Sequence, residues 1–211
     1  MGRKKKIVIF TFFMFIFVAI YILYFLSNYY DPGNSDTPMF SLPIRPANYA
    51  NVTGVQRYHP PEHIGFDFRL PNATEIVAPK GGKITDIKLH KMNNNLWIVD
   101  VFLRINPIWG MFIAFEPCTY DQNVAIAQKA NISAYIHIGQ VVLENQTLGW
   151  LQPEPGSEFP HIHWTVFKVG AWGLLGNVGF ENVNPYHYLA PWAKSVCDGY
   201  CSTFYDYTPC G

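Results

Sequence analysis

Two pairs of polar side chains in the 211-residue chain have the types and spacing of metal ligands. One pair, His161 and His163, lies in a segment rich in β-branched and aromatic residues, which predicts a strand. Because side chains alternate between the two faces of a strand, both imidazoles point the same way. For this pair alone, the alternative is a hydrated polar strand face without any metal.

The other pair, His63 and Asp67, lies in a segment where polar and apolar residues alternate from position 63 to position 70. That period predicts a half-buried strand with the imidazole and the carboxylate on one face. Gly65 lies between them, and we expect its missing side chain to leave room for an ion or a substrate. The alternative is a salt-bridged polar face with a glycine bulge.

Together the two pairs offer the ligands of a catalytic zinc site. Zinc in such sites takes three protein nitrogen or oxygen ligands and keeps one position open for water. His63, Asp67 and one of the paired histidines would supply the three ligands. The remaining histidine could then act as a general base, because zinc lowers the pKa of its water to ~7.

The elements expected to position these residues are short strands separated by turn residues. We expect a hairpin over residues 75–89 and further strands at 96–105, 109–115, 134–142 and 148–151. Residues 121–133 are the least strand-like part and could hold one short helix. This pattern predicts an all-β sandwich or open barrel.

The ends of the chain differ in composition from the middle. Residues 7–26 form an uncharged apolar run of 20 residues after a basic cluster, which predicts an uncleaved transmembrane helix with its N-terminus in the cytoplasm. We therefore divide the chain into a basic tip and anchor (1–27), an extended proline-containing stalk (28–50), a folded domain (51–190) and an aromatic tail with three cysteines (191–211).

Charge and modification signals agree with a domain outside the cell membrane. Four of the 15 Lys and Arg residues and none of the 15 Asp and Glu residues precede the apolar run, so the rest carries 11 minus 15, or −4. This balance argues against a nucleic-acid partner. Four Asn-X-Ser/Thr sequons begin at Asn51, Asn72, Asn131 and Asn145, and they suggest glycosylation.

The chain has four cysteines: Cys118 and, near its end, Cys197, Cys201 and Cys210. An even number outside the cell indicates two disulfides, with a metal-binding cysteine cluster as the alternative. If all four pair, every connectivity joins Cys118 to the tail. The tail would then either cover the substrate groove or act as a simple C-terminal staple.

Four motifs occur in an order that points to one family. They are His-x-x-x-Asp at residues 63–67, a Val-x-Ala-x-x-x-Gly-type hairpin at 77–84, a Gly-centred stretch at 136–142 followed by Leu148-Gly149, and Pro-His-x-His at 160–163. Over roughly residues 55–190 the chain resembles the LytM/lysostaphin-type zinc endopeptidases, peptidase family M23. The resemblance implies a largely antiparallel β fold and zinc held by His63, Asp67 and His163. It also implies that His161 is the catalytic base.

One position departs from the family pattern. These enzymes usually carry a further catalytic histidine where this chain has Glu116, and His137 is the alternative candidate for that role. An ionised Glu116 cannot donate a hydrogen bond to a developing oxyanion, and loss of such a donor typically costs ~10²–10³ in rate. Glu116 could instead serve as a base, as a further ligand, or as a donor when protonated.

The sequence therefore supports three hypotheses. The first is a membrane-anchored zinc endopeptidase that cuts cell-wall or surface peptides, since peptidoglycan is the usual substrate of the family it resembles. The second is a binding or regulatory module on the same fold without turnover. The third is a structural metal closed by a fourth ligand such as Glu116.

Overall fold

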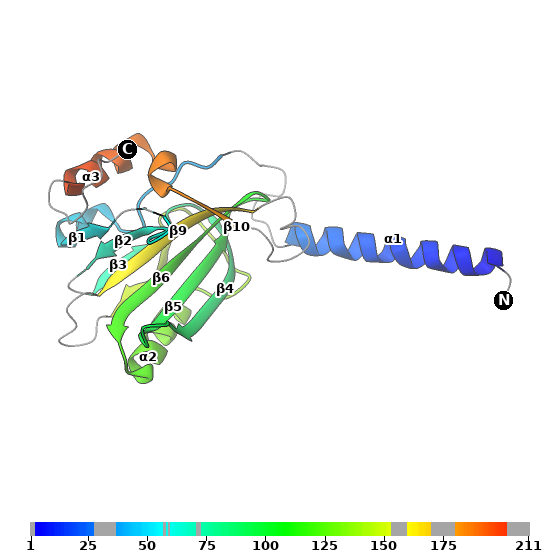
Figure 1. Ribbon diagram of the computed structural model, residues 1–211, viewed down its shortest axis with the longest axis horizontal. Coiled ribbons are helices and arrows are strands. Elements are labelled where there is room, and N and C mark those ends of the chain that lie inside the picture. Colours follow the sequence, from blue (N-terminus) through cyan, green and yellow to red (C-terminus); the bar gives the residue numbers. More distant parts are fainter. Residues whose placement is uncertain are drawn as a thin grey trace.

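The computed structural model describes residues 3–27, 37–56, 58, 60–70, 73–152, 160–169 and 180–201 (Figure 1). The helices are α1 (Arg3–Ser27), α2 (Gln122–Ser133) and α3 (Pro191–Cys201), with 3-10 turns η1 (Pro46–Asn51) and η3 (Pro185–Tyr188). The strands are β1 (Gly54–Gln56), β2 (Phe66–Arg69), β3 (Thr74–Val77), β4 (Gly82–Lys91), β5 (Trp97–Arg104), β6 (Trp109–Thr119), β7 (Val141–Val142), β8 (Thr147–Leu151), β9 (His161–Val169) and β10 (Phe180–Val183).

The described strands form one large and one small antiparallel sheet. The large sheet has the order β1-β2-β9-β6-β5-β4-β7, with β10 also paired to β9, and the small one pairs β3 with β8. The prediction of a mostly antiparallel β fold is therefore confirmed. No closed barrel forms among these strands.

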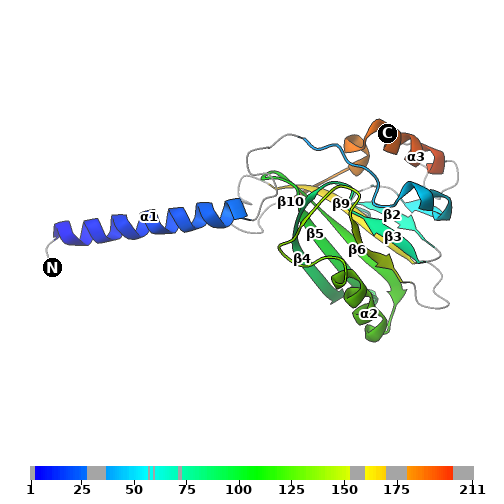
Figure 2. The same ribbon diagram turned by 180° about the vertical axis from the view of Figure 1, so that it is seen from behind.

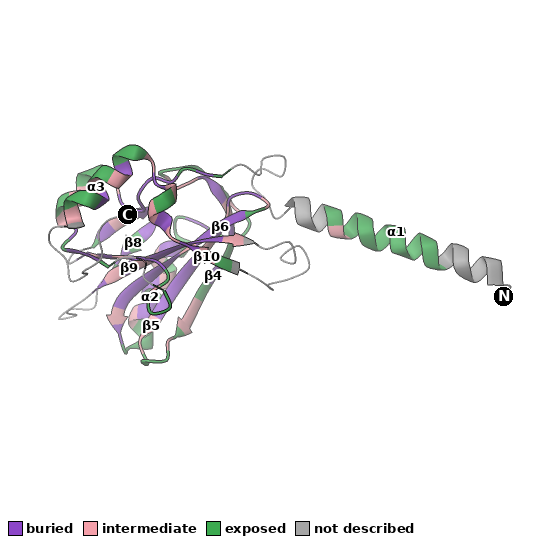
Figure 3. Cartoon of the chain, turned by 45° about the horizontal axis from the view of Figure 1, so that its top comes forward, coloured by how far each residue is buried: buried purple, intermediate pink, exposed green. Residues whose placement is uncertain are grey.

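The large sheet has one apolar and one polar face, as a period of two requires. One row across β5, β6, β9 and β2 consists of Val101, Ile113, Trp164 and Phe66 in register, all at most 2% exposed. The neighbouring row on the other face contains His163 and Asp67. Figure 3 shows that the central strands of the sheet are largely buried. Burial of the apolar rows thus fixes which way the candidate ligands point.

Helix α2 lies in the segment that we expected to hold a short helix. It begins at an N-cap, where the side chain of Asp121 accepts a hydrogen bond from the backbone N–H of Asn123 at 2.8 Å, as capping side chains commonly do. Its buried residues include Gln128 and Ile132. Figure 2 shows α2 against the lower ends of β5 and β6.

Two strand predictions are wrong in their details. The expected hairpin over 75–89 does not form, because β3 pairs with β8 and β4 pairs with β5. Residues 134–140 contain no strand; only Val141–Val142 pairs, with β4. Gly139 adopts a φ of +90°, a turn conformation that interrupts an extended segment.

The segment 37–50, part of the expected stalk, is packed into the domain. Phe40, Leu42 and Ile44 are at most 1% exposed. Phe40 forms a bridge to Leu189, and Ile44 forms one to Ile76. Apolar residues at every second position allow an extended segment to bury one face, so this part contributes to the core.

Helix α1 covers the segment that we expected to be an anchor and lies apart from the sheet in Figure 1. Its described side chains, residues 10–22, are almost all exposed. Within the described part of the chain, no helix is both long and apolar enough to cross a membrane.

The two expected disulfides find no support. The structure records no disulfide between the cysteines whose side chains it describes, Cys118 and Cys197. The side chains of Cys201 and Cys210, and the aromatic tail after residue 201, lie outside the described residues. The sequon at Asn72 lies outside them as well.

Candidate metal centre

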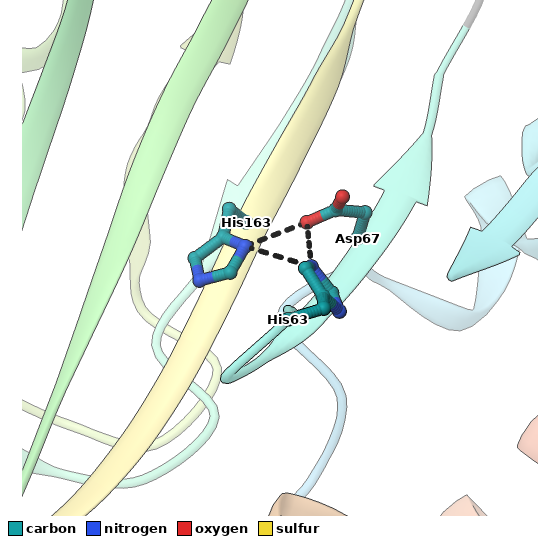
Figure 4. Close-up of side chains that lie close together, drawn as sticks. All are labelled: His63, Asp67 and His163. Atoms are coloured by element: carbon teal, nitrogen blue, oxygen red, sulfur yellow. Dashed lines mark hydrogen bonds and ion pairs between the residues drawn. The ribbon is translucent and has the colours of Figure 1, made fainter. Parts of the chain in front are cut away.

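Strands β2 and β9 bring His63, Asp67 and His163 together (Figure 4). Asp67 and His163 are register partners in the ladder between the two strands, and His63 lies three residues before β2. Asp67 Oδ1 is 2.7 Å from His163 Nδ1 and 3.0 Å from His63 Nε2. The two ring nitrogens are 3.2 Å apart.

These three atoms fit a small cation. In a tetrahedral zinc site with bonds near 2.0 Å, ligand atoms are about 3.3 Å apart, slightly more than the separations of 2.7–3.2 Å in this triangle. Unprotonated ring nitrogens and a carboxylate oxygen at these distances would direct lone pairs at one another, so a positive charge is needed between them. A proton supplies that charge to one pair at a time, whereas a metal ion supplies it to all three.

The charge of Asp67 suits this role. Burial works against its ionised form, but hydrogen bonds from His163 and His63 hold the pKa of this carboxyl well below its usual range. Asp67 is therefore a carboxylate at neutral pH, as a metal ligand must be.

Thr165 orients the His163 ring from behind. The Thr165 hydroxyl donates to the carbonyl of Ile64 at 3.1 Å, so its oxygen can accept from His163 Nε2–H at 2.8 Å. A metal ion between the three atoms requires that tautomer, because Nδ1 must then carry no proton. Without a metal, a proton on Nδ1 makes the hydrogen bond to Asp67 that lowers the pKa of the carboxyl. Metal-binding histidines are commonly fixed in this way through their second nitrogen. Phe112 stacks on the same ring, with the ring planes 27° apart.

Gly65 does not provide the open space that we expected. A Cβ placed there would lie 2.6 Å from His163 Nε2 and 2.7 Å from Thr165 Oγ1. The space is therefore filled by the two groups that fix the ligand ring. The glycine is required by close packing beneath the site.

We expect Gly65→Ala to weaken metal binding by at least about 10-fold, because the added methyl must displace either His163 or Thr165. Titration of the full-length protein with zinc measures this. Gly199→Ala is the matched control, since a Cβ at Gly199 meets no atom within 4 Å. Unchanged zinc affinity in Gly65→Ala would show that the ring is held by other contacts.

His161 and Glu116 lie beside the three candidate ligands. They are register partners on β9 and β6, and His161 Nε2 lies 3.2 Å from Glu116 Oε2 and 3.8 Å from Asp67 Oδ2. Burial opposes the charge of His161, but hydrogen bonds to Cys118 and Glu116 raise its pKa to about 11. Glu116 itself is only 8% exposed.

His137 lies elsewhere. It is exposed in the turn before β7, where its backbone N–H bonds to Gln140. Of the two candidates for the role of the additional histidine, the structure brings only Glu116 next to His161.

Sequence reasoning missed a second buried carboxyl on this face of the sheet. Asp100 is paired with Ala114, which in turn is paired with His163, so Asp100 lies two strands from the candidate ligands. It is 7% exposed, and its Oδ1 has no hydrogen-bond partner. Burial and the charge of Glu116 raise its pKa to about 7. The signal was a lone aspartate between two valines in a predicted strand.

No family model matches the chain, and no curated protein matches it either. Among solved structures, it is similar to an M23 peptidase from Pseudomonas aeruginosa with 21% identity and a TM-score of 0.46, over 75% of this chain and 53% of that one. It is also similar to lysostaphin from Staphylococcus simulans, with 18% identity and a TM-score of 0.44 over 83% of this chain and 60% of that one. A zinc-containing peptidase from Vibrio cholerae is similar with 15% identity and a TM-score of 0.45, over 71% of this chain and 40% of that one. The chain thus matches between 40% and 60% of the length of these proteins.

Proposed function

We propose that this chain is a zinc endopeptidase that is anchored in a membrane and hydrolyses peptide bonds on its outer side. The observation that carries the proposal is the triangle of His63 Nε2, Asp67 Oδ1 and His163 Nδ1, with separations of 2.7–3.2 Å. Two neutral imidazoles and one carboxylate form a ligand set that leaves a fourth zinc position open.

Each side chain has a separate task in this proposal. His63, Asp67 and His163 hold the zinc, whose chemistry is to polarise a carbonyl and to lower the pKa of a water molecule. His161, within 3.8 Å of Asp67 Oδ2, is the general base in its neutral form. The positive charge of a bound zinc ion would favour this form over the protonated one, which the contacts with Cys118 and Glu116 stabilise. Glu116, at 3.2 Å from the same imidazole, holds it in place and balances its charge.

The substrate class and location are further parts of the proposal. Similar structures include lysostaphin, named as an antimicrobial peptidase, and a zinc-containing peptidase. With the family resemblance of the motifs, they support a peptide or peptidoglycan-like substrate. The basic tip and the apolar run of residues 7–26 support a single membrane pass with the domain outside.

A binding module without turnover is the second candidate. It is favoured by one observation: Glu116 is the partner of His161, at the position where the enzymes it resembles carry a hydrogen-bond donor. In that case zinc or a proton in the triangle would serve the structure alone.

Activity separates the two candidates. We expect the zinc-loaded full-length protein to cleave purified peptidoglycan or members of a quenched-fluorescence peptide library. Chelation should abolish cleavage and zinc should restore it. His161→Ala should keep its zinc and lose at least about 10²-fold in kcat, the lower range for removal of a general base. A zinc-loaded protein that cleaves neither substrate would favour the binding module.

A further inference from the structure

Cys118 has a strained backbone within a strand. Its φ is +56°, a left-handed conformation that residues with a Cβ adopt at a cost. The other non-glycine residues with positive φ in the described part are Asn95 and Asn145, both in turns. Asparagine tolerates this conformation, but cysteine does not share that tolerance. Such strain persists only where other contacts impose it, and it often marks a functional position.

The strain coincides with an irregularity in the sheet. The ladder between β6 and β9 reaches the Glu116–His161 pair, and the ladder between β5 and β6 changes register between Val99 and Trp97. An irregularity of this kind re-aims a side chain relative to its strand. Here it directs the sulfur of Cys118 to within 3.7 Å of His161 Nδ1.

The His161 ring is therefore contacted at both nitrogens. Nε2 faces Glu116 at 3.2 Å and Asp67 at 3.8 Å, while Nδ1 faces the sulfur. Rotating an imidazole by 180° about its Cβ–Cγ bond exchanges each nitrogen with a carbon. Such a flip would remove both contacts at once, so the sulfur opposes the wrong ring orientation.

We propose that Cys118 is a positioning residue for His161: its sulfur accepts the Nδ1–H and keeps Nε2 directed at Asp67 and Glu116. The strained backbone is the cost of aiming the sulfur at the ring. A thiol and a disulfide sulfur both carry the lone pairs that this contact uses. The contribution to turnover rests on the proposed function, but the ring orientation does not.

Three substitutions at position 118 separate the contact from the strain. Cys118→Ser keeps both an acceptor and the strain, Cys118→Ala keeps only the strain, and Cys118→Gly removes both. In ¹⁵N spectra of the full-length protein labelled at histidine, His161 is identified by its absence in His161→Ala. We expect its ring signals in Cys118→Ser to keep one form, and those in Cys118→Ala and Cys118→Gly to broaden or move towards exchange between two forms.

Stability provides the complementary measurement. Cys118→Gly should melt ~2–4 °C higher than Cys118→Ala, because glycine adopts this φ without strain. Asn145→Gly is the control, since Asn145 has a φ of +65° on an exposed turn. It should leave the His161 signals unchanged. Identical His161 ring signals in the alanine, glycine and parent proteins would overturn the proposal, whether or not any of them hydrolyses a peptide.

If the protein is active, Cys118→Ala and Cys118→Gly should lower kcat and leave KM unchanged. Cys118→Ser should restore kcat towards the value of the parent. Loss of hydrolysis in every protein, with the expected ring signals, would contradict the proposed function and leave the positioning role intact. Full kcat in Cys118→Ala would overturn the positioning role in catalysis.

Discussion

The His163→Ala protein is expected to lose its zinc, with an affinity more than ~100-fold below that of the parent. Removing an outer partner of a ligand typically costs 10–100-fold in metal affinity, and His163 is one corner of the triangle itself. Its loss leaves two donor atoms, His63 Nε2 and Asp67 Oδ1, too few for a stable zinc site. Elemental analysis after dialysis should give about one zinc per parent chain and almost none in the variant.

Two further variants define what this result means. His137→Ala removes an exposed histidine outside the cluster and should keep its zinc. Thr165→Val removes only the hydroxyl behind the ring and should cost about 10–100-fold in affinity, the range for a supporting hydrogen bond. Full zinc occupancy in a folded His163→Ala protein would remove the basis of the proposed function.

Asp100→Asn is expected to stabilise the protein above pH 7 by up to ~4 kcal/mol. The folded-state pKa of Asp100 is raised from 3.8 to about 7, by burial and then by the charge of Glu116. The folded state therefore holds this proton more tightly than the unfolded state does. Between pH ~4 and ~7 the free energy of unfolding therefore falls as the pH rises, by ~1.4 kcal/mol for each pH unit.

Asparagine has nearly the same shape and does not titrate, so the variant should lack this loss. The measurement is the free energy of unfolding of both proteins from pH 4 to pH 8, and the predicted quantity is their difference. Glu62→Gln is the control, because it removes the same charge from an exposed position and should give a flat difference. A flat difference for Asp100→Asn as well would show that the Asp100 carboxyl finds a compensating charge. The nearest candidate is His90, whose Nδ1 lies 3.5 Å from Asp100 Oδ2.

The mostly antiparallel fold and the grouping of three candidate ligands could be predicted because both follow from local spacing. Alternation in two short segments put His63 with Asp67 and His161 with His163, and their chemistry indicated that the two segments meet. In the structure the two segments pair as antiparallel strands, with Asp67 opposite His163. The helix that begins at Gln122 could be predicted for the same reason, because its sequence lacks the alternation of a strand.

Thr165, Asp100 and Cys118 could not be found in this way. Their significance depends on which strands are neighbours: Asp100 lies in the same row as His163 and Asp67 only because β5, β6, β9 and β2 are adjacent. Strand propensity records how well a residue fits a pleated surface, and it does not choose partners. The backbone strain at Cys118 has no sequence signal at all.

The same limit explains the wrong hairpin and the unexpected packing of residues 37–50. The turn around Gly81 suggested that its flanking strands pair, but Ala78 N–H bonds to the carbonyl of Gln146, 68 residues later. Prolines near Phe40 and Ile44 suggested an isolated stalk. Instead, the side chains of Phe40 and Ile44 are buried, and their backbones form bridges to Leu189 and Ile76.

In the proposed membrane-anchored form, the burial of Phe40, Leu42 and Ile44 would limit how far the domain can stand from the bilayer. A free stalk over residues 28–50 could extend ~75 Å at ~3.3 Å per residue. Because the chain joins the core soon after residue 37, only the nine residues 28–36 separate α1 from the described domain. They span at most ~30 Å. An anchored enzyme of this design would act on polymer lying close to the bilayer surface, and lengthening this tether should widen the layer that it can reach.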